Sequence, residues 1–346
     1  MEHVGIDVHK NQSQICILTA DGELLEKRIQ TRRDRFAAVL GGPSRTILIE
    51  ASTESEWVAR CLEELGHRVL VADPNYAPMY GSRNRRVKTD RRDARALAEA
   101  CRNGTYRLAH RASDAQRHVR ARLAVRDNLV RTRTRYISLI RALLRREGYR
   151  VRSGSSDSFP RRVGELDLAS HLKEEIAPLL VLLEVLGEQI RRATGELEEL
   201  VRGDAAVQRL QTMPCIGMLT ASCFVATLDS PERFVGVGRM RSFLGLVPRE
   251  RSSGEKQRKG GITKAGPPRL RWQLVEAAWR ILLGRQEALK PLQDWAMGIA
   301  RRRGRKVAAV ALARKIAGIL YAMWRDGTDF DAARLGVNSA RSTAAA

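Results

Sequence analysis

The chain of 346 residues contains only five cysteines, and no two of them form a Cys-x-x-Cys pair. A disulfide framework and a structural zinc site are therefore not expected. No apolar run reaches the roughly 18 residues that a membrane-spanning helix needs, and the first residues contain no apolar signal segment. We therefore expect a cytoplasmic protein that has no membrane partner.

Acidic residues are also scarce relative to basic ones. The 39 Asp and Glu are outnumbered by 62 Lys and Arg, so the formal net charge is +23. A soluble protein with this excess of positive charge most often binds a polyanion, and nucleic acid is the expected partner. Hydrophobic residues make up 43% of the chain, which is enough for a folded core and excludes wholesale disorder.

The first hundred residues have the pattern of an α/β domain. Short apolar or alternating runs, separated by turn signals such as Asp21-Gly22, predict strands at 4–8, 13–19, 24–29, 46–49 and 69–72. Helical spacing predicts a helix at 55–65 and a second helix that begins at the cap residue Thr89. We expect the first domain to span 1–113.

The rest of the chain has mainly helical patterns. Two long helices, at about 114–149 and 165–203, predict a helical hairpin or coiled coil over 114–204. A C-terminal helical domain is expected over 205–328, with a flexible tail at 329–346. Within it, the turn at 213–217 separates two helical patterns; a helix-hairpin-helix contact with phosphate and a purely structural turn fit it equally well.

Four acidic residues of the first domain occur where strands and a helix bring them together. Asp7 lies inside the first apolar strand, where a charge is costly unless it is paired or binds a metal. Glu50 closes a second apolar strand, and strand ends carry functional groups in such sheets. Asp90 and Asp93 are three positions apart at the start of a helix, so they share one face. Nearby in sequence, His9 has no role that the pattern assigns.

This order of acids is that of an RNase H-like fold of the RuvC type. We expect Asp7, Glu50, Asp90 and Asp93 to be catalytic and to bind two Mg²⁺ (or Mn²⁺) ions about 4 Å apart, which stabilise the attacking and leaving oxygens of a phosphodiester. Each acid alone has a simpler explanation, such as the helix dipole for Asp90 and Asp93. The ordered set favours metal ligation.

A polar, glycine-rich segment at 248–261 leads into further basic residues. Eight cations in this region are candidate phosphate contacts: Arg249, Arg251, Lys256, Arg258, Lys259, Lys264, Arg269 and Arg271. The simplest interpretation is a solvated, flexible loop. In a second interpretation Ser253 is a nucleophile, and the cations stabilise a pentacovalent phosphate.

Six motifs, in order, resemble the DEDD transposases of the IS110 family of insertion sequences. They are Gly5-Ile6-Asp7-Val8-His9-Lys10, Ile49-Glu50-Ala51-Ser52, Lys88-Thr89-Asp90-Arg91-Arg92-Asp93-Ala94, Leu244-Gly245-Leu246-Val247-Pro248-Arg249, Ser252-Ser253-Gly254 and Gly261-Ile262-Thr263-Lys264-Ala265-Gly266. The resemblance covers about residues 4–325. One departure is Cys215, which stands where the resemblance leads us to expect glycine.

The resemblance implies a RuvC-like domain, a coiled coil and a C-terminal transposase domain. It implies Mg²⁺ at the four acids and a serine nucleophile at Ser253, with Ser252 as the adjacent alternative, that forms a covalent phosphoserine with DNA. The expected partners are target and donor DNA, a noncoding bridge RNA that pairs with both, and further copies of the chain in a dimer and then a tetramer, with acids and serine from different subunits.

Three other functions are compatible with parts of this pattern. A metal-dependent nuclease or Holliday junction resolvase would use the same acids with water as the nucleophile. An ATP-dependent sugar-kinase or actin-like protein also begins with a Gly-Ile-Asp strand, but Gly41-Gly42-Pro43 is a poor phosphate loop and the net charge argues against it. A noncatalytic RNA-binding scaffold would not need the acids.

Overall fold

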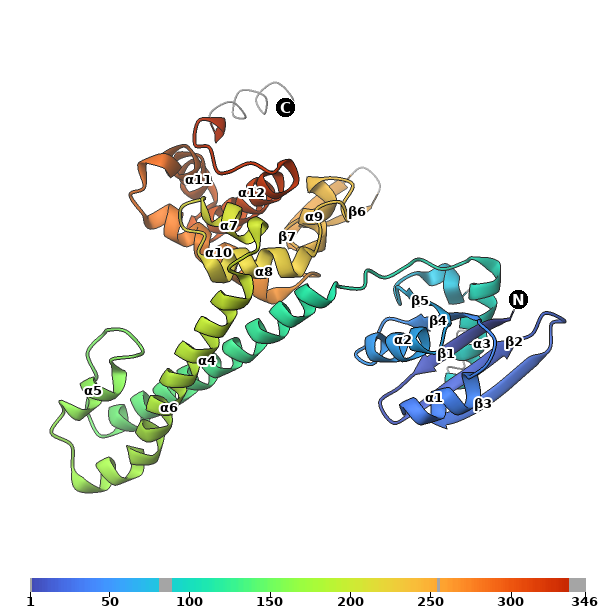
Figure 1. Ribbon diagram of the computed structural model, residues 1–346. Coiled ribbons are helices and arrows are strands. Elements are labelled where there is room, and N and C mark those ends of the chain that lie inside the picture. The colour runs from blue at the N-terminus through green and yellow to red at the C-terminus, as the bar shows by residue number, and fades with distance from the viewer. Residues whose placement is uncertain (1, 81–88, 254–255, 336–346) are drawn as a thin grey trace. The chain divides into compact units, whose positions relative to one another are not determined.

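The computed structural model describes residues 2–80, 89–253 and 256–335, and of residues 251–253 and 256–259 only the backbone. The chain divides into two compact units, Met1–Ala112 and Ser113–Ala346, which are taken separately below (Figure 1). The finer division into a helical hairpin, a C-terminal domain and a tail stays a prediction.

The first unit is built on a five-stranded mixed sheet. Its strands are β1 (His3–Val8), β2 (Gln12–Leu18), β3 (Leu24–Gln30), β4 (Thr46–Glu50) and β5 (Arg68–Ala72). Their order is β3-β2-β1-β4-β5; β1, β2 and β3 pair antiparallel, whereas β4 and β5 run parallel to β1. This topology is compatible with an RNase H-like domain, and the five predicted strands are confirmed.

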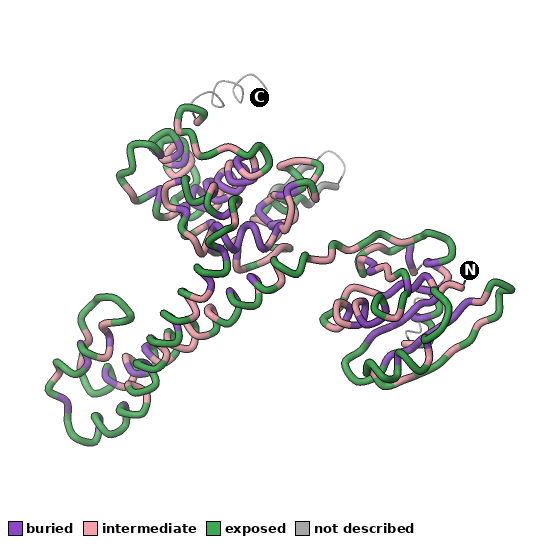
Figure 2. Tube along the Cα trace, in the orientation of Figure 1, coloured by how far each residue is buried: buried purple, intermediate pink, exposed green. Residues whose placement is uncertain are grey.

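Helices cover both faces of this sheet. On one face, the side chains of Val4, Ile6 and Val8 pack with α1 (Arg33–Leu40) and α2 (Ser55–Glu64). On the other face lies α3 (Asp90–Asn103), and η1 (Ala77–Tyr80) contacts it. The central strands β1, β2 and β4 are buried, while β3 is largely exposed (Figure 2). Helix α1 was not predicted, because only Phe36 and Leu40 of its side chains are buried.

Gly5 allows α3 to lie directly against β1. A Cβ atom at this position would come within 2.1 Å of the Ala94 carbonyl oxygen and 2.2 Å of the Ala98 amide nitrogen. Both are backbone atoms, so the helix could accommodate a side chain only by moving away. The short helix-to-strand distance brings the first turn of α3 toward the next residues of β1.

The second unit begins with two long helices, α4 (Asp114–Arg146) and α6 (Ser170–Val201). The start of α4 meets the end of α6, where Nε of Arg126 donates to Oγ1 of Thr194 at 2.8 Å. The end of α4 packs with the start of α6 in a separate apolar cluster. The two helices are therefore antiparallel; whether they supercoil stays a prediction. The segment between these two helices contains a short helix, α5 (Phe159–Gly164), whose Phe159 is fully buried in that cluster.

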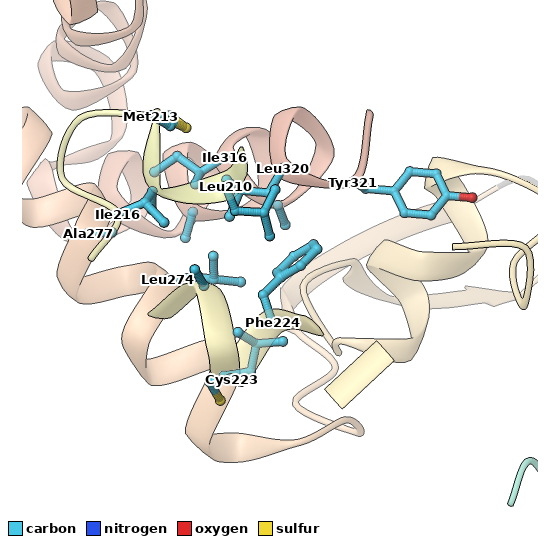
Figure 3. Packing of buried hydrophobic residues seen from close by; sticks show 14 of the residues in the cluster. Leu210, Met213, Ile216, Cys223, Phe224, Leu274, Ala277, Ile316, Leu320 and Tyr321 are labelled. Atoms are coloured by element: carbon cyan, nitrogen blue, oxygen red, sulfur yellow. The ribbon is translucent and has the colours of Figure 1, made fainter. Parts of the chain in front are cut away.

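The C-terminal part of this unit is a helical assembly around one apolar core. Its elements are α7 (Ala205–Gln211), α8 (Met218–Leu228), α9 (Val237–Phe243), α10 (Pro268–Leu283), η2 (Glu287–Leu289), α11 (Lys290–Arg303) and α12 (Arg305–Asp326). Phe224 of α8, Leu274 of α10 and Leu320 of α12 are fully buried and belong to the same cluster (Figure 3). Helix α11 was not predicted; Arg301, Arg302 and Arg303 lie in its last turn.

Helix α12 is the one described helix that is long and apolar enough to cross a membrane. In the structure, 56% of its most apolar window is buried inside the protein. Its apolar side chains pack with those of α8 and α10 in the core, so its composition is explained by packing.

The expectation of a flexible loop at 248–261 is wrong. This segment forms an antiparallel hairpin of β6 (Pro248–Ser253) and β7 (Lys256–Ile262), paired from Pro248 opposite Ile262 to Ser253 opposite Lys256. The hairpin was missed because its hydrogen bonds join backbone atoms, and its polar sequence has no apolar alternation to mark a strand.

The turn between α7 and α8 contains a strained residue. Cys215 has a φ angle of 69°, in the left-handed region that favours glycine. This is the position where the family resemblance led us to expect glycine. Glycine adopts this conformation without strain, whereas the cysteine side chain makes it less favourable. Whether the turn is a helix-hairpin-helix motif stays a prediction.

Candidate functional site

Asp7 and Glu50 lie side by side at one edge of the sheet in the first unit. Strands β1 and β4 are parallel, with Ile6 opposite Ile49, so the next residues in this register are Asp7 and Glu50. Side chains alternate along a strand. Since Ile6 and Ile49 pack toward α1 and α2, the two acids face the α3 side.

The first turn of α3 supplies the other two acids. Thr89 caps this helix, and its side chain accepts a hydrogen bond from the amide of Arg92 at 3.3 Å. The cap fixes where the helix begins and therefore where Asp90 and Asp93 lie. Asp93 is buried, at 4% exposure, whereas the side chain of Asp90 is about half exposed.

His9 joins this group, although no sequence pattern assigned it a role. Its Nε2 lies 3.3 Å from Oδ2 of Asp7 and 3.4 Å from Oδ1 of Asp90. The other oxygen of Asp90, Oδ2, lies 3.9 Å from the guanidinium of Arg28. The sequence contained one indication of this contact. His9 comes two residues after Asp7, and side chains two positions apart lie on the same side of a strand.

Tyr80 is a second residue that sequence analysis missed. At the end of η1, its hydroxyl donates a hydrogen bond to Oε2 of Glu50. This bond orients the carboxylate and leaves Oε1 as its other oxygen. No pattern in the sequence connects Tyr80 with Glu50, because their contact depends on how η1 returns over the sheet.

The acids act on one another electrostatically. The pKa of Asp7 is raised to about 6, mainly by burial; the charge of His9 opposes this shift, and the nearby charges of Asp93, Asp90 and Glu50 contribute to it. The pKa of Tyr80 is also raised, first by burial and then by its hydrogen bond to Glu50. Bringing these carboxylates together therefore costs free energy. Such a cost is expected at a site where a bound cation offsets the negative charge.

The donor atoms suit a divalent cation. One ligand atom each from Asp7, His9 and Asp90 lies within 4.8 Å of the others, so a modest adjustment would bring all three to one ion. Carboxylate oxygens are the ligands of Mg²⁺ and Mn²⁺, and imidazole nitrogen is a ligand of transition metals. Glu50 and Asp93 lie close enough to influence Asp7 and complete the carboxylate set.

The predicted serine belongs to the second unit. Ser253 is the last residue of β6 and Ser252 precedes it; their side chains lie outside the described residues, as do those of Arg251, Lys256, Arg258 and Lys259. The adjoining Gly254 is not described at all. The four acids are thus brought together by the first unit alone, and the serine is contributed by another part of the chain.

The remaining four predicted phosphate contacts differ in their surroundings. Arg249 and Lys264 are exposed. Arg269 pairs with Asp127 of α4 at 2.8 Å, and Arg271 donates to the carbonyl oxygens of Leu244 and Gly266 at 3.0 and 2.9 Å. Arg269 and Arg271 therefore stabilise the fold, and the pKa of Arg271 is lowered by burial.

Comparison with known proteins gives consistent matches along the chain. The family model described as "Transposase IS116/IS110/IS902 family" matches residues 207–292, and a transposase model of the IS110 DEDD type matches residues 4–147. The transposase for insertion sequence element IS1328 of Yersinia enterocolitica is 31% identical over 94% of this chain and 98% of its own length. The transposase for insertion sequence element IS1111A of Coxiella burnetii is 29% identical over 92% of this chain and 88% of its own length.

Proposed function

Since the chain belongs to the IS110 family of transposases, enzymes that cleave and join DNA, we propose that it moves an insertion sequence through two catalytic groups. The first is the set Asp7, Glu50, Asp90 and Asp93, which binds Mg²⁺ or Mn²⁺. The second is Ser253, which forms a covalent phosphoserine with a DNA strand. Ser252 is the alternative nucleophile.

The proposal depends mainly on one observation. Four acids lie together on the α3 face of the sheet, at the end where strands β1 and β4 finish. Asp7 and Glu50 come from neighbouring parallel strands, and Asp90 and Asp93 come from the first turn of the helix that packs on them. The raised pKa of Asp7 supports a site that is completed by a cation. A bound divalent ion would supply Lewis-acid stabilisation of the phosphodiester oxygens.

The protein's own groups perform the remaining steps. Oγ of Ser253 would bond to phosphorus, its proton would pass to solvent, and the phosphorus–oxygen bond to one deoxyribose would break, which leaves a free hydroxyl on that strand end. A hydroxyl of another strand would then attack the phosphoserine and release the serine. Exposed cations such as Arg249 and Lys264 would hold the phosphate backbone near the hairpin.

We further propose the assembly that the family resemblance implies. The acids and Ser253 belong to different units of the chain, so a site shared between subunits of a dimer or tetramer is one way in which they could meet. A noncoding bridge RNA would pair with target and donor DNA, and the net charge of +23 suits a complex that binds several polyanions. The protein would act in the cytoplasm.

The decisive experiment traps the covalent intermediate. Ser253→Ala should abolish a protein–DNA adduct that survives denaturing electrophoresis, while the adjacent Ser252→Ala should retain it. Asp7→Asn should abolish cleavage as well. Cleavage by Ser253→Ala to free 5′-phosphate ends without an adduct would instead favour the nuclease or junction resolvase, which uses water.

A further inference from the structure

Three cationic side chains in the second unit converge without an acidic partner. Arg241 belongs to α9, while Arg314 and Lys315 are neighbours on α12, against which α9 packs. All three are half-buried. In the parts of the chain that the structure describes, none of them forms an ion pair with Asp or Glu. The charges that act on Arg241 and Lys315 come from other cations.

A glycine on α12 creates the space for Arg241. A Cβ atom at Gly318 would lie 2.2 Å from Nη2 and 3.0 Å from Cζ of Arg241. Gly318 is one helical turn after Arg314, so both residues lie on the same face of α12. The guanidinium of Arg241 thus rests on the bare backbone of α12 beside a second arginine. Its Nε is buried and has no hydrogen-bond partner among the described groups.

Lys315 is held in place by an aromatic ring. Its Nζ lies 4.4 Å from the ring centroid of Trp295 on α11, which is a cation–π contact. The Trp295 side chain remains 39% exposed, so this end of the cluster is open to solvent. An elongated ligand could therefore reach Lys315 from outside.

The cluster is unfavourable without a negatively charged ligand. Burial lowers the pKa of Arg241, and the charge of Arg314 lowers it further. Burial also lowers the pKa of Lys315, with Arg241 as the second cause. Desolvation and mutual repulsion both oppose the three charges. Arginine cannot lose its proton in a protein, so an anion is the means by which the cluster can be compensated.

We propose that Arg241, Arg314 and Lys315 form a binding site for a phosphodiester of a nucleic-acid backbone. A guanidinium offers two parallel N–H donors to phosphate oxygens, and the ammonium adds a point charge. The site contains none of the four acids and none of the eight cations expected from the sequence. It depends on neither the metal nor the serine chemistry, so binding can be measured without cleavage.

The test uses the full chain in EDTA, with fluorescent duplex DNA and single-stranded RNA as two separate probes. Arg241→Gln should weaken binding about tenfold at fixed salt, and the slope of log affinity against log salt should fall by about one. Arg192→Gln removes an equal charge from α6, where Arg192 pairs with Glu196, and should change affinity far less.

A second variant tests the geometry without changing the charge. Gly318→Ala should displace the Arg241 guanidinium and weaken binding, whereas Gly298→Ala on α11, which meets nothing within 4 Å, should not. Weakening of only the DNA probe or only the RNA probe supports the site and identifies its ligand. If Arg241→Gln and Gly318→Ala bind both probes as their controls do, the proposal is overturned. If thermal melting shows that the Arg241→Gln variant is not folded, the Lys315→Gln variant is used in its place.

Discussion

Nε2 of His9 lies 3.3 Å from Oδ2 of Asp7, and Oδ1 of Asp90 is 3.4 Å from the same nitrogen. The imidazole therefore bridges an acid of the sheet and an acid of the helix. Ligand atoms at about these separations can surround one ion after small side-chain adjustments. His9 would then be a nitrogen donor in a set that otherwise consists of carboxylates.

We expect His9→Ala to weaken Mn²⁺ binding by at least about tenfold, the loss typical when a group that supports a metal site is removed. Mg²⁺ binding should fall less, because Mg²⁺ prefers oxygen ligands. Calorimetric titration of the full chain with each metal measures both constants. His171→Ala, an exposed histidine of α6, is the control. Equal affinities of His9→Ala and wild type for Mn²⁺ would contradict a role for this histidine.

Asp7→Asn should stabilise the metal-free protein at neutral pH. The folded-state pKa of about 6 lies above the ordinary value of 3.8, so ionisation of Asp7 opposes folding, and this penalty grows as pH rises from about 4 to 6. The neutral amide avoids it and should gain about 1 to 3 kcal/mol at pH 8. Thermal unfolding in EDTA should show a larger difference between variant and wild type at pH 8 than at pH 4. A difference independent of pH would mean that Asp7 titrates normally.

Gly5→Ala should destabilise the first unit and weaken its metal binding together. The added Cβ would clash with the backbone of α3 at Ala94 and Ala98, and overpacking of this kind costs about 1–3 kcal/mol. The first turn of α3 would move away from Asp7. Gly195→Ala on α6 meets nothing within 4 Å and should be neutral or stabilising. Chemical denaturation and Mn²⁺ titration measure the two effects, and an unchanged Gly5→Ala variant would refute the close contact.

Cys215→Gly should stabilise the second unit by about 1 kcal/mol. The residue has a φ angle of 69°, where a side chain costs roughly 1–2 kcal/mol and glycine does not; greater freedom of the unfolded chain offsets part of this gain. Cys215→Ala is the matched control, since it removes the thiol but retains Cβ. If both variants have the same stability by denaturant unfolding, backbone strain at this turn is not significant.

Much of the first unit was predictable from local patterns. Strands β1, β2, β4 and β5 have apolar or alternating runs that end at turn residues, and Thr89 marks the start of α3 as a capping residue. The four acids could be singled out because a carboxylate in an apolar strand, or two at one helix start, departs from the local pattern. Helix α1, which buries only Phe36 and Leu40, and the polar β6–β7 hairpin left no such signal.

Sequence alone determined that this protein is basic, folded and rich in helix, and its motifs pointed to the family that the comparisons established. Only the tertiary structure decided that His9 and Tyr80 contact the acids, that Arg271 stabilises the fold, and that Arg241 lies against Gly318, close enough to Arg314 and Lys315 for their charges to interact. The physical reason is the distance along the chain over which each kind of interaction acts. Periodicity and capping act over a few residues along the chain, whereas charge, burial and side-chain contact depend on distances that exist only after distant segments have packed together.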